Sequence, residues 1–496
     1  MNLQAIKDLA VFLSSKYRLQ DNSLSILPEI CPPGMKGELT INCFRLAQIL
    51  KGNPEIIAND ALVFLTSHPD VLSAEKIRAF VNFAFKEESL FRDTIANPKQ
   101  ILASAKVSDK EKKRYLIEYS APNTNKPLHL GHLRNNTLGM SLASLLKRVG
   151  NDVTAVNLIN DRGIHICKSM LAYKRFGNGA TPESAGKKGD HFVGDFYVKF
   201  DSELRKELKN LRDSDSGAAG KSDEDLFALT QIGKEAQEIL RKWESGDHET
   251  IALWKMMKKW VLEGFDKTYK RMGIEFDKIY LESETYKLGK DIVLQGEKDG
   301  IFMRREDGAI VADLKPFGLT EKVLLRADGT SVYITQDIGT TIKKYEEFRP
   351  DCQIWVVGDE QIHHFKTLFA LIKLLGFSWA DNLYHLSYGM INLPTGKMKS
   401  REGTVVDADN LFDDMHKLAK DAALERCEGN IPCDIEGRSE IIAQGALKFM
   451  LLKFNPKTTI MFDPQASIKF EGDTGPYVQY VCARINSILK KAHSSM

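Results

Sequence analysis

The sequence predicts an α/β protein built on a doubly wound parallel sheet, and two observations carry this prediction. A strand, a helix and a second strand follow one another between residues 114 and 159, which is the order of a βαβ unit. The same alternation resumes between residues 353 and 391. We therefore expect a Rossmann-like core in two halves with insertions between them. A small α+β domain should precede this core, and a helical part should follow it.

The composition narrows the class of protein. The chain has 496 residues, 43% of them hydrophobic, which is typical of a soluble protein with several domains. Lys and Arg number 69 against 67 Asp and Glu, so a nucleic-acid partner would have to meet a local positive surface. The seven cysteines include no CxxC pair and indicate neither a disulfide framework nor a zinc site, so we expect no resident metal.

Targeting signals are not visible in the sequence. The longest apolar runs fall far short of the ~20 residues that span a bilayer. The N-terminus lacks a basic stretch followed by an apolar core. We expect a cytoplasmic protein with no membrane contact.

The N-terminal part, residues 1–108, reads as an α+β module. Residues 37–43 alternate like a strand, 46–51 look helical and 78–85 look like another strand. The lysine-rich stretch 106–113 is either a linker or a helix with a solvated charged face.

The first half of the parallel sheet follows. We expect a strand over 114–119, a loop with two prolines over 120–127, a helix from Leu130 and a strand over 153–159. The predicted helix has apolar residues spaced by three and four, at Leu138, Leu142, Leu145 and Val149.

The rest of the chain is an insertion, a second half and a helical end. Charged helical stretches at 202–212 and 251–272 flank the low-complexity loop 214–222. The sheet then resumes with a strand at 353–357, a helix at 362–375 and a strand at 383–391, and the chain becomes mostly helical from Asn410.

A histidine motif lies between a predicted strand and helix. His129 and His132 are one helical turn apart, so they point to the same side, and Gly131 lets a flat base or sugar approach the backbone. A helix N-terminus also favours an anionic phosphate. The alternatives are two surface histidines or half of a metal site. A zincin would need glutamate after the first histidine, where this chain has Leu130.

A second motif, residues 396–404, reads Gly-Lys-Met-Lys-Ser-Arg-Glu-Gly-Thr. A lysine-rich loop after a strand can close over a polyphosphate and neutralise it as charge moves. By itself this string would be a solvated basic loop. Its order after the HxGH motif indicates a nucleotide site instead.

The two motifs together resemble those of class I aminoacyl-tRNA synthetases, and several further segments resemble arginyl-tRNA synthetases in particular. These segments are 120–126, 190–198, 333–337, 397–406 and 470–480. The resemblance implies ATP-dependent activation of L-arginine to arginyl-adenylate, with Mg²⁺ accompanying ATP, and transfer to the 3′ end of tRNA(Arg). It also implies a monomer.

The resemblance implies a role for each matching residue. The catalytic residues would be Lys126, His129, His132 and Lys397, and ATP would also contact Gly131, Met398 and Ser400. Asn123 would contact the backbone end of arginine, with Glu282 and Gln361 in the same pocket. Tyr333 and Asp337 would hold the guanidinium, which wants a bidentate carboxylate and tolerates stacking on a ring. Alternatively, Asp337 merely pairs with a surface lysine such as Lys343.

Two departures from the family pattern stand out. Ser400 occupies the place of the second lysine of the KMSKS-like loop, while Lys399 stands where a serine is usual. Family members without that lysine carry one upstream of HxGH, and Lys126 occupies that position here. Arg162 stands where the family usually has tryptophan.

The resemblance also implies a division of the chain. We expect a tRNA elbow-binding type of module (1–108), two halves of the catalytic domain (109–172 and 331–409) around insertions with intervening catalytic segments (173–330), a helical connective region (410–470) and the start of a truncated anticodon-binding domain (471–496). An apolar stripe at Val478, Val481, Ile485 and Leu489 would normally pack against following helices, and without them it must fold back or be exposed.

Two rival functions remain open. HxGH also occurs in nucleotidylyltransferases that act on small molecules, although these are much shorter. A non-catalytic synthetase-like tRNA-binding protein is the other alternative. It would be expected to have lost HxGH or the arginine pocket.

Overall fold

A computed structural model describes most of the chain, and the chain divides into two compact units, Met1–Glu111 and Lys112–Met496. The described residues are 4–19, 24–32, 34–89, 105–214, 216–218, 220–392, 406–426 and 433–494.

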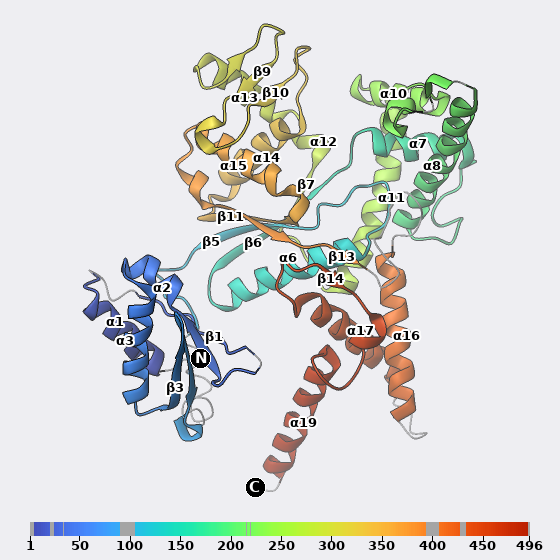
Figure 1. Ribbon diagram of the computed structural model, residues 1–496. Helices are drawn as coiled ribbons and strands as arrows, with labels where there is room; N and C mark the ends of the chain where they lie inside the picture. Colours follow the sequence, from blue (N-terminus) through green and yellow to red (C-terminus); the bar gives the residue numbers. More distant parts are fainter. Residues whose placement is uncertain are drawn as a thin grey trace. The chain divides into compact units, whose positions relative to one another are not determined.

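The first unit is a small α+β fold, as expected (Figure 1). Its antiparallel sheet has the order β1-β2-β4-β3. The elements are α1 (Gln4–Lys16), β1 (Glu29–Ile30), β2 (Leu39–Asn42), α2 (Cys43–Leu50), α3 (Pro54–Ser67), β3 (Val71–Ile77) and β4 (Phe80–Phe85). The Asn42 side chain accepts a hydrogen bond from the Phe44 backbone N–H and so starts α2 earlier than the sequence suggested. The stretch 106–113 is turn and coil, so the helical alternative for it is wrong.

The second unit contains the predicted parallel sheet. The strand order is β12-β11-β5-β6-β7 and every neighbouring pair is parallel. The strands are β5 (Arg114–Glu118), β6 (Asp152–Ile159), β7 (Lys278–Leu281), β11 (Cys352–Gly358) and β12 (Leu383–Tyr388). Because the order reverses between β5 and β11, the fold is doubly wound as predicted. Sequence analysis missed β7.

Helices cover both faces of this sheet. In β11, Ile354 and Val356 pack in the cluster that contains Leu133 of α6 (Leu130–Arg148), whereas Trp355 packs in the cluster of α14 (Tyr333–Phe348) and α15 (Ile362–Leu374). In Figure 1, α14 and α15 lie above the sheet and α6 lies below it. Alternate residues of one strand therefore serve two cores.

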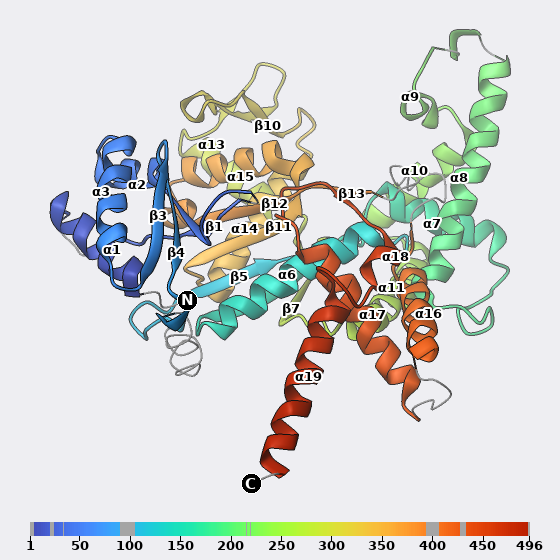
Figure 2. The same ribbon diagram turned by 60° about the horizontal axis from the view of Figure 1, so that its bottom comes forward.

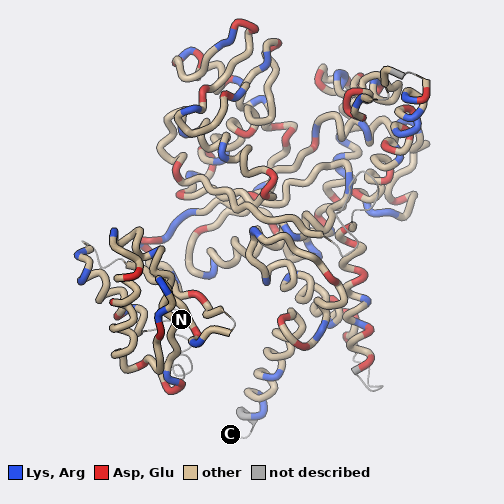
Figure 3. Tube along the Cα trace, viewed as in Figure 1, with Lys and Arg blue, Asp and Glu red and all other residues tan. Residues whose placement is uncertain are grey.

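Two insertions separate the sheet halves. Between β6 and β7 lie α7 (Ile164–Phe176), α8 (Gly189–Ser214), η1 (Ser216–Ala218), α9 (Asp223–Phe227), α10 (Gln231–Glu244) and α11 (His248–Met272). The expected helices 202–212 and 251–272 are thus parts of the longer α8 and α11. Between β7 and α14 lie α12 (Glu282–Thr285), α13 (Leu288–Lys298), η2 (Lys315–Phe317) and a three-stranded antiparallel sheet of β8 (Met303–Arg304), β9 (Ile310–Ala312) and β10 (Lys322–Leu325). Acidic and basic residues are interspersed along α8, as on a solvated helix (Figure 3).

The C-terminal part is mostly helical. It contains α16 (Ala408–Arg426), α17 (Ile435–Leu452), α18 (Pro464–Ser467) and α19 (Gly475–Ser494), with η3 (Asp359–Gln361) and η4 (Ser378–Asn382) earlier in the chain. The strand expected over 383–391 is broken into β12 and β13 (Ile391–Asn392), and β13 pairs in parallel with β14 (Ile460–Met461).

Helix α19 extends away from its neighbours in both views (Figures 1 and 2). Its predicted apolar stripe is exposed: Val478, Val481, Ile485 and Leu489 each show between 39% and 51% of their surface. Among the described residues, no helix combines the length and apolar character needed to cross a bilayer.

Arg134 of α6 is the largest of the fully buried side chains. Its guanidinium donates to the backbone carbonyls of Gly389 (3.1 Å), Leu451 (3.0 Å), Pro456 (2.8 Å) and Thr458 (3.0 Å). Burial lowers the pKa of Arg134. One side chain thus ties α6 to the loop after β12 and to the segment between α17 and β14.

Removing this guanidinium should destabilise the second unit selectively. We expect Arg134→Met to lower its free energy of unfolding by at least about 3 kcal/mol, because several buried carbonyls lose their donor. All five tryptophans, Trp243, Trp254, Trp260, Trp355 and Trp379, lie in this unit, so tryptophan fluorescence during urea unfolding reports on it alone. The control is Arg148→Met at the exposed end of the same helix, with an expected change below about 1 kcal/mol. Equal effects of the two substitutions would contradict this account of Arg134.

Candidate active site

The predicted site residues follow the carboxyl ends of the parallel strands. Asn123, Lys126 and His129 come after β5, Glu282 follows β7 directly, and Gln361 follows β11. Tyr333 and Asp337 lie in the first turns of α14, the helix that leads into β11. In open α/β sheets ligands bind outside the carboxyl ends of the strands, beside the point where the strand order reverses. The topology therefore brings these residues to one edge of the sheet.

The chain leaves β5 in an unusual backbone conformation. Ser120 has φ +80° and Ala121 has φ +46°, and residues other than glycine rarely adopt this backbone region. The Ser120 N–H donates to Asn135 Oδ1 (2.6 Å) and the Ala121 N–H donates to Asn157 Oδ1 (3.0 Å). These two buried amides stabilise the strained turn that leads to Asn123.

The two histidines of HxGH stand at the first turn of α6. His129 occupies the N-cap position, and its backbone N–H donates to Nδ1 of His132 (3.1 Å). The centroids of the two rings are 3.9 Å apart. A Cβ atom at Gly131 would lie 3.0 Å from Cε1 of His129, so glycine leaves room for that ring. The motif thus presents two adjacent imidazoles at a helix N-terminus.

Burial determines the charge of this group. Desolvation, with the nearby charge of Lys126 as a smaller cause, lowers the pKa of His129 to about 3. The same causes, together with His129, hold the pKa of His132 well below its ordinary value. Both imidazoles are therefore neutral at pH 7. Lys126 is also partly buried, which lowers its pKa, and it supplies positive charge beside them.

A cavity of about 180 Å³ opens beside these residues. Lys126, His129, His191 and Asp407 contribute to its walls, together with Pro127, Leu128, Gly194, Asp195, Tyr197 and Val198. A half-open cavity with a lysine and a neutral imidazole on its walls suits a phosphate group.

The KMSKS-like loop cannot be placed, because Lys397, Met398, Lys399 and Ser400 lie outside the described residues. The residues on either side of residues 393–405 are both tied to α6. Gly389 accepts from Arg134, and the Val406 carbonyl accepts from the Leu130 N–H (3.0 Å). Both flanks of this segment are therefore anchored next to HxGH.

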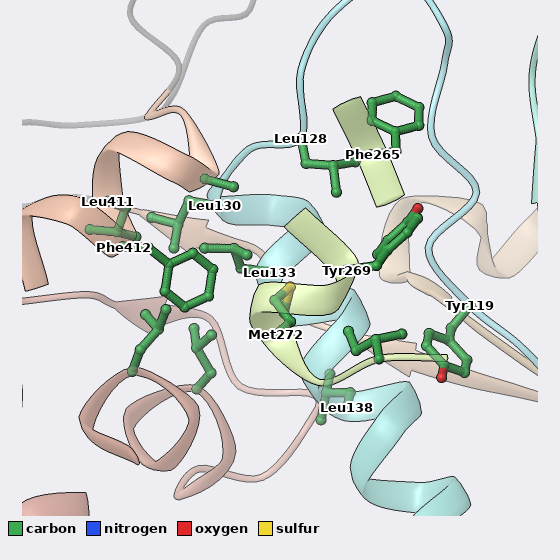
Figure 4. Close-up of a cluster of buried hydrophobic side chains, with 14 of the residues drawn as sticks. Tyr119, Leu128, Leu130, Leu133, Leu138, Phe265, Tyr269, Met272, Leu411 and Phe412 are labelled. Atoms are coloured by element: carbon green, nitrogen blue, oxygen red, sulfur yellow. The ribbon is translucent and has the colours of Figure 1, made fainter. Parts of the chain in front are cut away.

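An apolar cluster supports the histidine motif from behind (Figure 4). It joins residues of the HxGH segment and α6 to α11 and α16, namely Leu128, Leu130, Leu133, Leu138, Phe265, Tyr269, Met272, Leu411 and Phe412. The first turn of α6 is thus fixed by packing as well as by hydrogen bonds.

Asp337 has a partner that the sequence did not suggest. Its Oδ2 lies 2.7 Å from Nε2 of His364, at the start of α15, and not beside the surface lysine that was the alternative partner. Tyr333, one turn earlier, is 79% exposed, and Gln361 is also exposed. The Tyr333 ring and the Gln361 amide face solvent, while the Asp337 carboxylate is held by an imidazole.

Glu282 is a second carboxylate in this region. Burial raises its pKa to about 7, and the charges of Asp161 and Asp337 add to this effect, whereas Arg162 opposes it. The charge of Asp337 contributes to the raised pKa of Glu282, so these two predicted site residues share one electrostatic environment. A site with two nearby carboxylates attracts a ligand with two positive charges.

Asp161 organises the base of this site, and sequence analysis missed it. Its side chain is fully buried and bonds Lys258 Nζ (3.0 Å), the Ser283 N–H (2.8 Å) and Ser283 Oγ (2.7 Å). Its carbonyl accepts from Nε1 of Trp254 (2.6 Å). One residue after β6 therefore fixes both α11 and the residue next to Glu282. The signal in the sequence was an acidic residue two positions after the end of a predicted strand.

Arg162 replaces the tryptophan usual in the resembled family with another flat group. Its guanidinium carbon lies 4.0 Å from the ring centroid of Tyr286 and 5.4 Å from that of Trp243. It also forms an ion pair with Glu244 (3.2 Å). A stacked arginine can take the packing role of an aromatic ring and adds a positive charge near Glu282.

Comparisons with known proteins identify the family of the chain. The family described as tRNA synthetases class I (R), catalytic domain, matches residues 97–463. The chain is 48% identical over 461 residues to an arginine–tRNA ligase of Parabacteroides distasonis, covering 92% of this chain and 76% of the relative. It is 46% identical over 463 residues to that of Porphyromonas gingivalis, covering 93% and 77%.

Solved structures agree as well. Thermus thermophilus arginyl-tRNA synthetase superposes with a TM-score of 0.75 at 25% identity, covering 99% of this chain and 82% of that one. The Plasmodium falciparum enzyme, at 18% identity, shares the fold with a TM-score of 0.66 and coverage of 99% and 81%. The fold and the matched domain are those of class I aminoacyl-tRNA synthetases. Within that class, the chain belongs to the arginyl-tRNA synthetase family.

The buried carboxylate of Asp161, which bonds Lys258 and Ser283, gives a stability prediction. Asp161→Ala should lower the free energy of unfolding by about 3–5 kcal/mol, because it leaves the Lys258 ammonium without its buried partner. Urea unfolding followed by tryptophan fluorescence measures this change. Asp195→Ala removes an exposed partner of Lys187 and should cost less than about 1 kcal/mol. A loss at Asp161 no larger than at Asp195 would show that these bonds contribute little to stability.

Proposed function

We propose that the chain is an arginine–tRNA ligase. In the first step the carboxylate of L-arginine attacks the α-phosphate of ATP, forming arginyl-adenylate and releasing pyrophosphate. In the second step a hydroxyl at the 3′ end of tRNA(Arg) takes the arginyl group and releases AMP. The observation that supports this proposal is the HxGH group at the N-terminus of α6, with Glu282 and Asp337 at the same edge of the sheet, in a chain of this family.

The phosphate chemistry falls to Lys126, His129 and His132. Little covalent help is needed for attack on a phosphate, so catalysis rests on positioning and on donors for the developing charge. The neutral imidazoles provide N–H donors and do not titrate near pH 7, and Lys126 provides the positive charge. ATP enters with Mg²⁺ as its substrate complex. Lys397, Met398 and Ser400 are proposed to close over the phosphates, and Gly131 to contact ATP.

The arginine pocket uses the second group of residues. Tyr333 and Asp337 are proposed to hold the guanidinium, with Gln361 contacting the substrate and Asn123 meeting its backbone end. Glu282 lines the same pocket. Arginine carries an ammonium and a guanidinium, and two nearby carboxylates match these two charges.

The remaining parts of the proposal concern the setting. Residues 1–108 are proposed to contact the tRNA elbow, and residues 471–496 to begin an anticodon-binding domain. We also propose a monomer that acts in the cytoplasm, where charged tRNA is consumed. Light scattering of the purified chain, with and without tRNA, tests the monomer.

One assay separates this function from its rivals. Arginine-dependent exchange between ATP and pyrophosphate, measured with tRNA present, is expected for the ligase, because the resembled family activates arginine only with tRNA bound. A nucleotidylyltransferase would exchange pyrophosphate with another substrate and without tRNA. A non-catalytic tRNA-binding protein would show no exchange at all.

His129 is the residue whose replacement tests the mechanism. We expect His129→Asn to lower kcat for arginine activation by roughly 10²–10³, the scale of losing one preorganised donor. The melting temperature should stay close to that of the wild type, because His129 caps a helix that packing already holds. Retained activity per folded molecule with a large loss of melting temperature would make His129 a structural residue instead.

The pKa of Glu282 predicts the pH dependence of arginine binding. With a pKa of about 7, Glu282 is ionised at pH 8 and mostly neutral at pH 6. Arginine affinity should therefore fall by about tenfold from pH 8 to pH 6, as the carboxylate gains its proton. Calorimetry at pH 6, 7 and 8 measures the affinity.

Two variants control that experiment. Glu282→Gln should bind arginine weakly at all three pH values and show little pH dependence. Glu284→Gln, two residues later and exposed, should keep the wild-type profile. A profile that Glu282→Gln leaves unchanged would remove Glu282 from the pocket.

A further inference from the structure

A partly buried group of charges lies beside the HxGH motif, and two of its members, His191 and Asp407, also line the cavity described above. We name it the Asp409 cluster; its members are Lys188, Asp190, His191, Thr268, Asp407 and Asp409. They come from the start of α8 and the residue before it, the last turns of α11, and the start of α16 and the residue before it. Three elements distant in sequence therefore meet at one set of polar contacts.

Asp409 is the centre of this cluster. It bonds the Lys188 ammonium, and its Oδ2 lies 2.9 Å from Nε2 of His191. Oδ1 accepts from Thr268 Oγ1 (3.1 Å). Every bond is charged or charge-assisted, and burial strengthens such bonds. The cation and the imidazole hold the pKa of Asp409 well below its usual range.

The cation in this cluster is part of the protein. Asp190, His191 and Asp409 offer ligand atoms within 4.8 Å of one another, as a metal site would. The Lys188 ammonium already binds both carboxylates, at 3.0 Å from Asp190 Oδ2. We therefore assign these residues a positioning role rather than a metal.

The cluster continues into the backbone of HxGH. Residues 406–408, which precede Asp409, pair antiparallel with residues 128–130. The Leu130 N–H donates to the Val406 carbonyl (3.0 Å), and the Ala408 N–H donates to the Leu128 carbonyl (2.9 Å). His129 lies opposite Asp407 in this pair. The carboxylate of Asp409 is thus two residues from the direct partner of His129.

Helix α8 touches the same motif from its other side. A Cβ atom at Gly194 would lie 2.8 Å from Cδ of Pro127, so glycine lets α8 approach the residue next to Lys126. His191 and Asp407 face the cavity that Lys126 and His129 also line. The second oxygen of Asp407 lies 3.4 Å from Nε2 of His191. Helix α8 and the 406–408 segment therefore enclose HxGH between them.

We propose that Asp409 is a positioning residue for the activation step: through Lys188 and His191 it fastens residues 406–408 to α8, and so holds His129 in place against the α-phosphate of ATP. The proposal rests on the proposed function, because it acts through His129. It also gives a role to the acidic residues Asp407 and Asp409 around the start of α16, which follows the KMSKS-like loop.

The test is a double-mutant cycle in the full chain, read as arginine-dependent pyrophosphate exchange with tRNA present. Asp409→Asn should lower kcat by about 10- to 100-fold, since a small misplacement of a catalytic group costs that much. KM for arginine should change less than about twofold, because the arginine pocket lies on other loops. In a His129→Asn background, Asp409→Asn should lower kcat less than about twofold, because its effect passes through the missing imidazole.

A matched control lies one turn further along α16. Asp413 pairs with Arg271 of α11 (2.6 Å), so Asp413→Asn removes the same charge from the same helix interface without touching HxGH. It should leave kcat unchanged. Should Asp409→Asn fail to fold, as judged by tryptophan fluorescence, His191→Gln replaces it in the cycle, since it breaks the same link from α8.

The outcomes distinguish the positioning role of Asp409 from the catalytic role of His129. Equal losses from Asp409→Asn in both backgrounds, or a loss no larger than that of Asp413→Asn, would overturn the positioning role. If His129→Asn by itself leaves kcat unchanged, the role proposed for His129 in the function is wrong, whatever Asp409 does.

Discussion

The buried guanidinium of Arg134 is the contact on which the geometry of the site depends. Among the described residues it has no carboxylate partner, and its hydrogen bonds go to backbone carbonyls of other segments. Because the acceptors are backbone carbonyls, these bonds fix the path of the main chain, whatever side chains those residues carry. Because Arg134 is two residues from His132, whatever holds Arg134 also holds the first turn of α6. The flank of the KMSKS-like loop and the β13–β14 pair are attached to the same point.

Electrostatics in the site follow from that rigidity. Desolvation keeps both imidazoles neutral well below physiological pH, and packing of α6 against α11 and α16 provides that desolvation. Burial destabilises the charged form of Lys126, and a bound polyanion would offset this cost by its attraction to the ammonium. The arginine side follows the opposite rule: carboxylates gather where the ammonium and the guanidinium of the substrate are proposed to bind.

Local patterns made most of the parallel sheet predictable. Strand β5, helix α6 and strand β6 begin within a residue of their predicted starts, because each has strong periodicity and clear turn signals at its ends. Strand β7 was missed because it has four residues, two of them exposed, after a long helix. The break between β12 and β13 was missed because Arg134, 255 residues earlier, binds the Gly389 carbonyl there.

The site divides in the same way. HxGH could be recognised because its residues are contiguous. The partner of Asp337 lies 27 residues away in His364, and the residue that fixes Ser283 lies 122 residues away in Asp161. The positive φ of Ser120 is stabilised by Asn135, which lies later in the chain, in α6. No short-range pattern encodes such pairs, because each depends on the tertiary fold that brings them together.

The strand order also governs how the chain folds during synthesis. Strand β11 pairs with β5 at the centre of the sheet, yet the bonded residues Arg114 and Asp351 are 237 positions apart. A ribosome takes roughly ten seconds to nearly a minute to add that many residues. During this interval β5 has β6 on one side and an unpaired edge on the other. The long insertion before β11 thus prolongs the exposure of a hydrophobic sheet edge, and the nascent chain is most vulnerable to aggregation or chaperone capture in that interval.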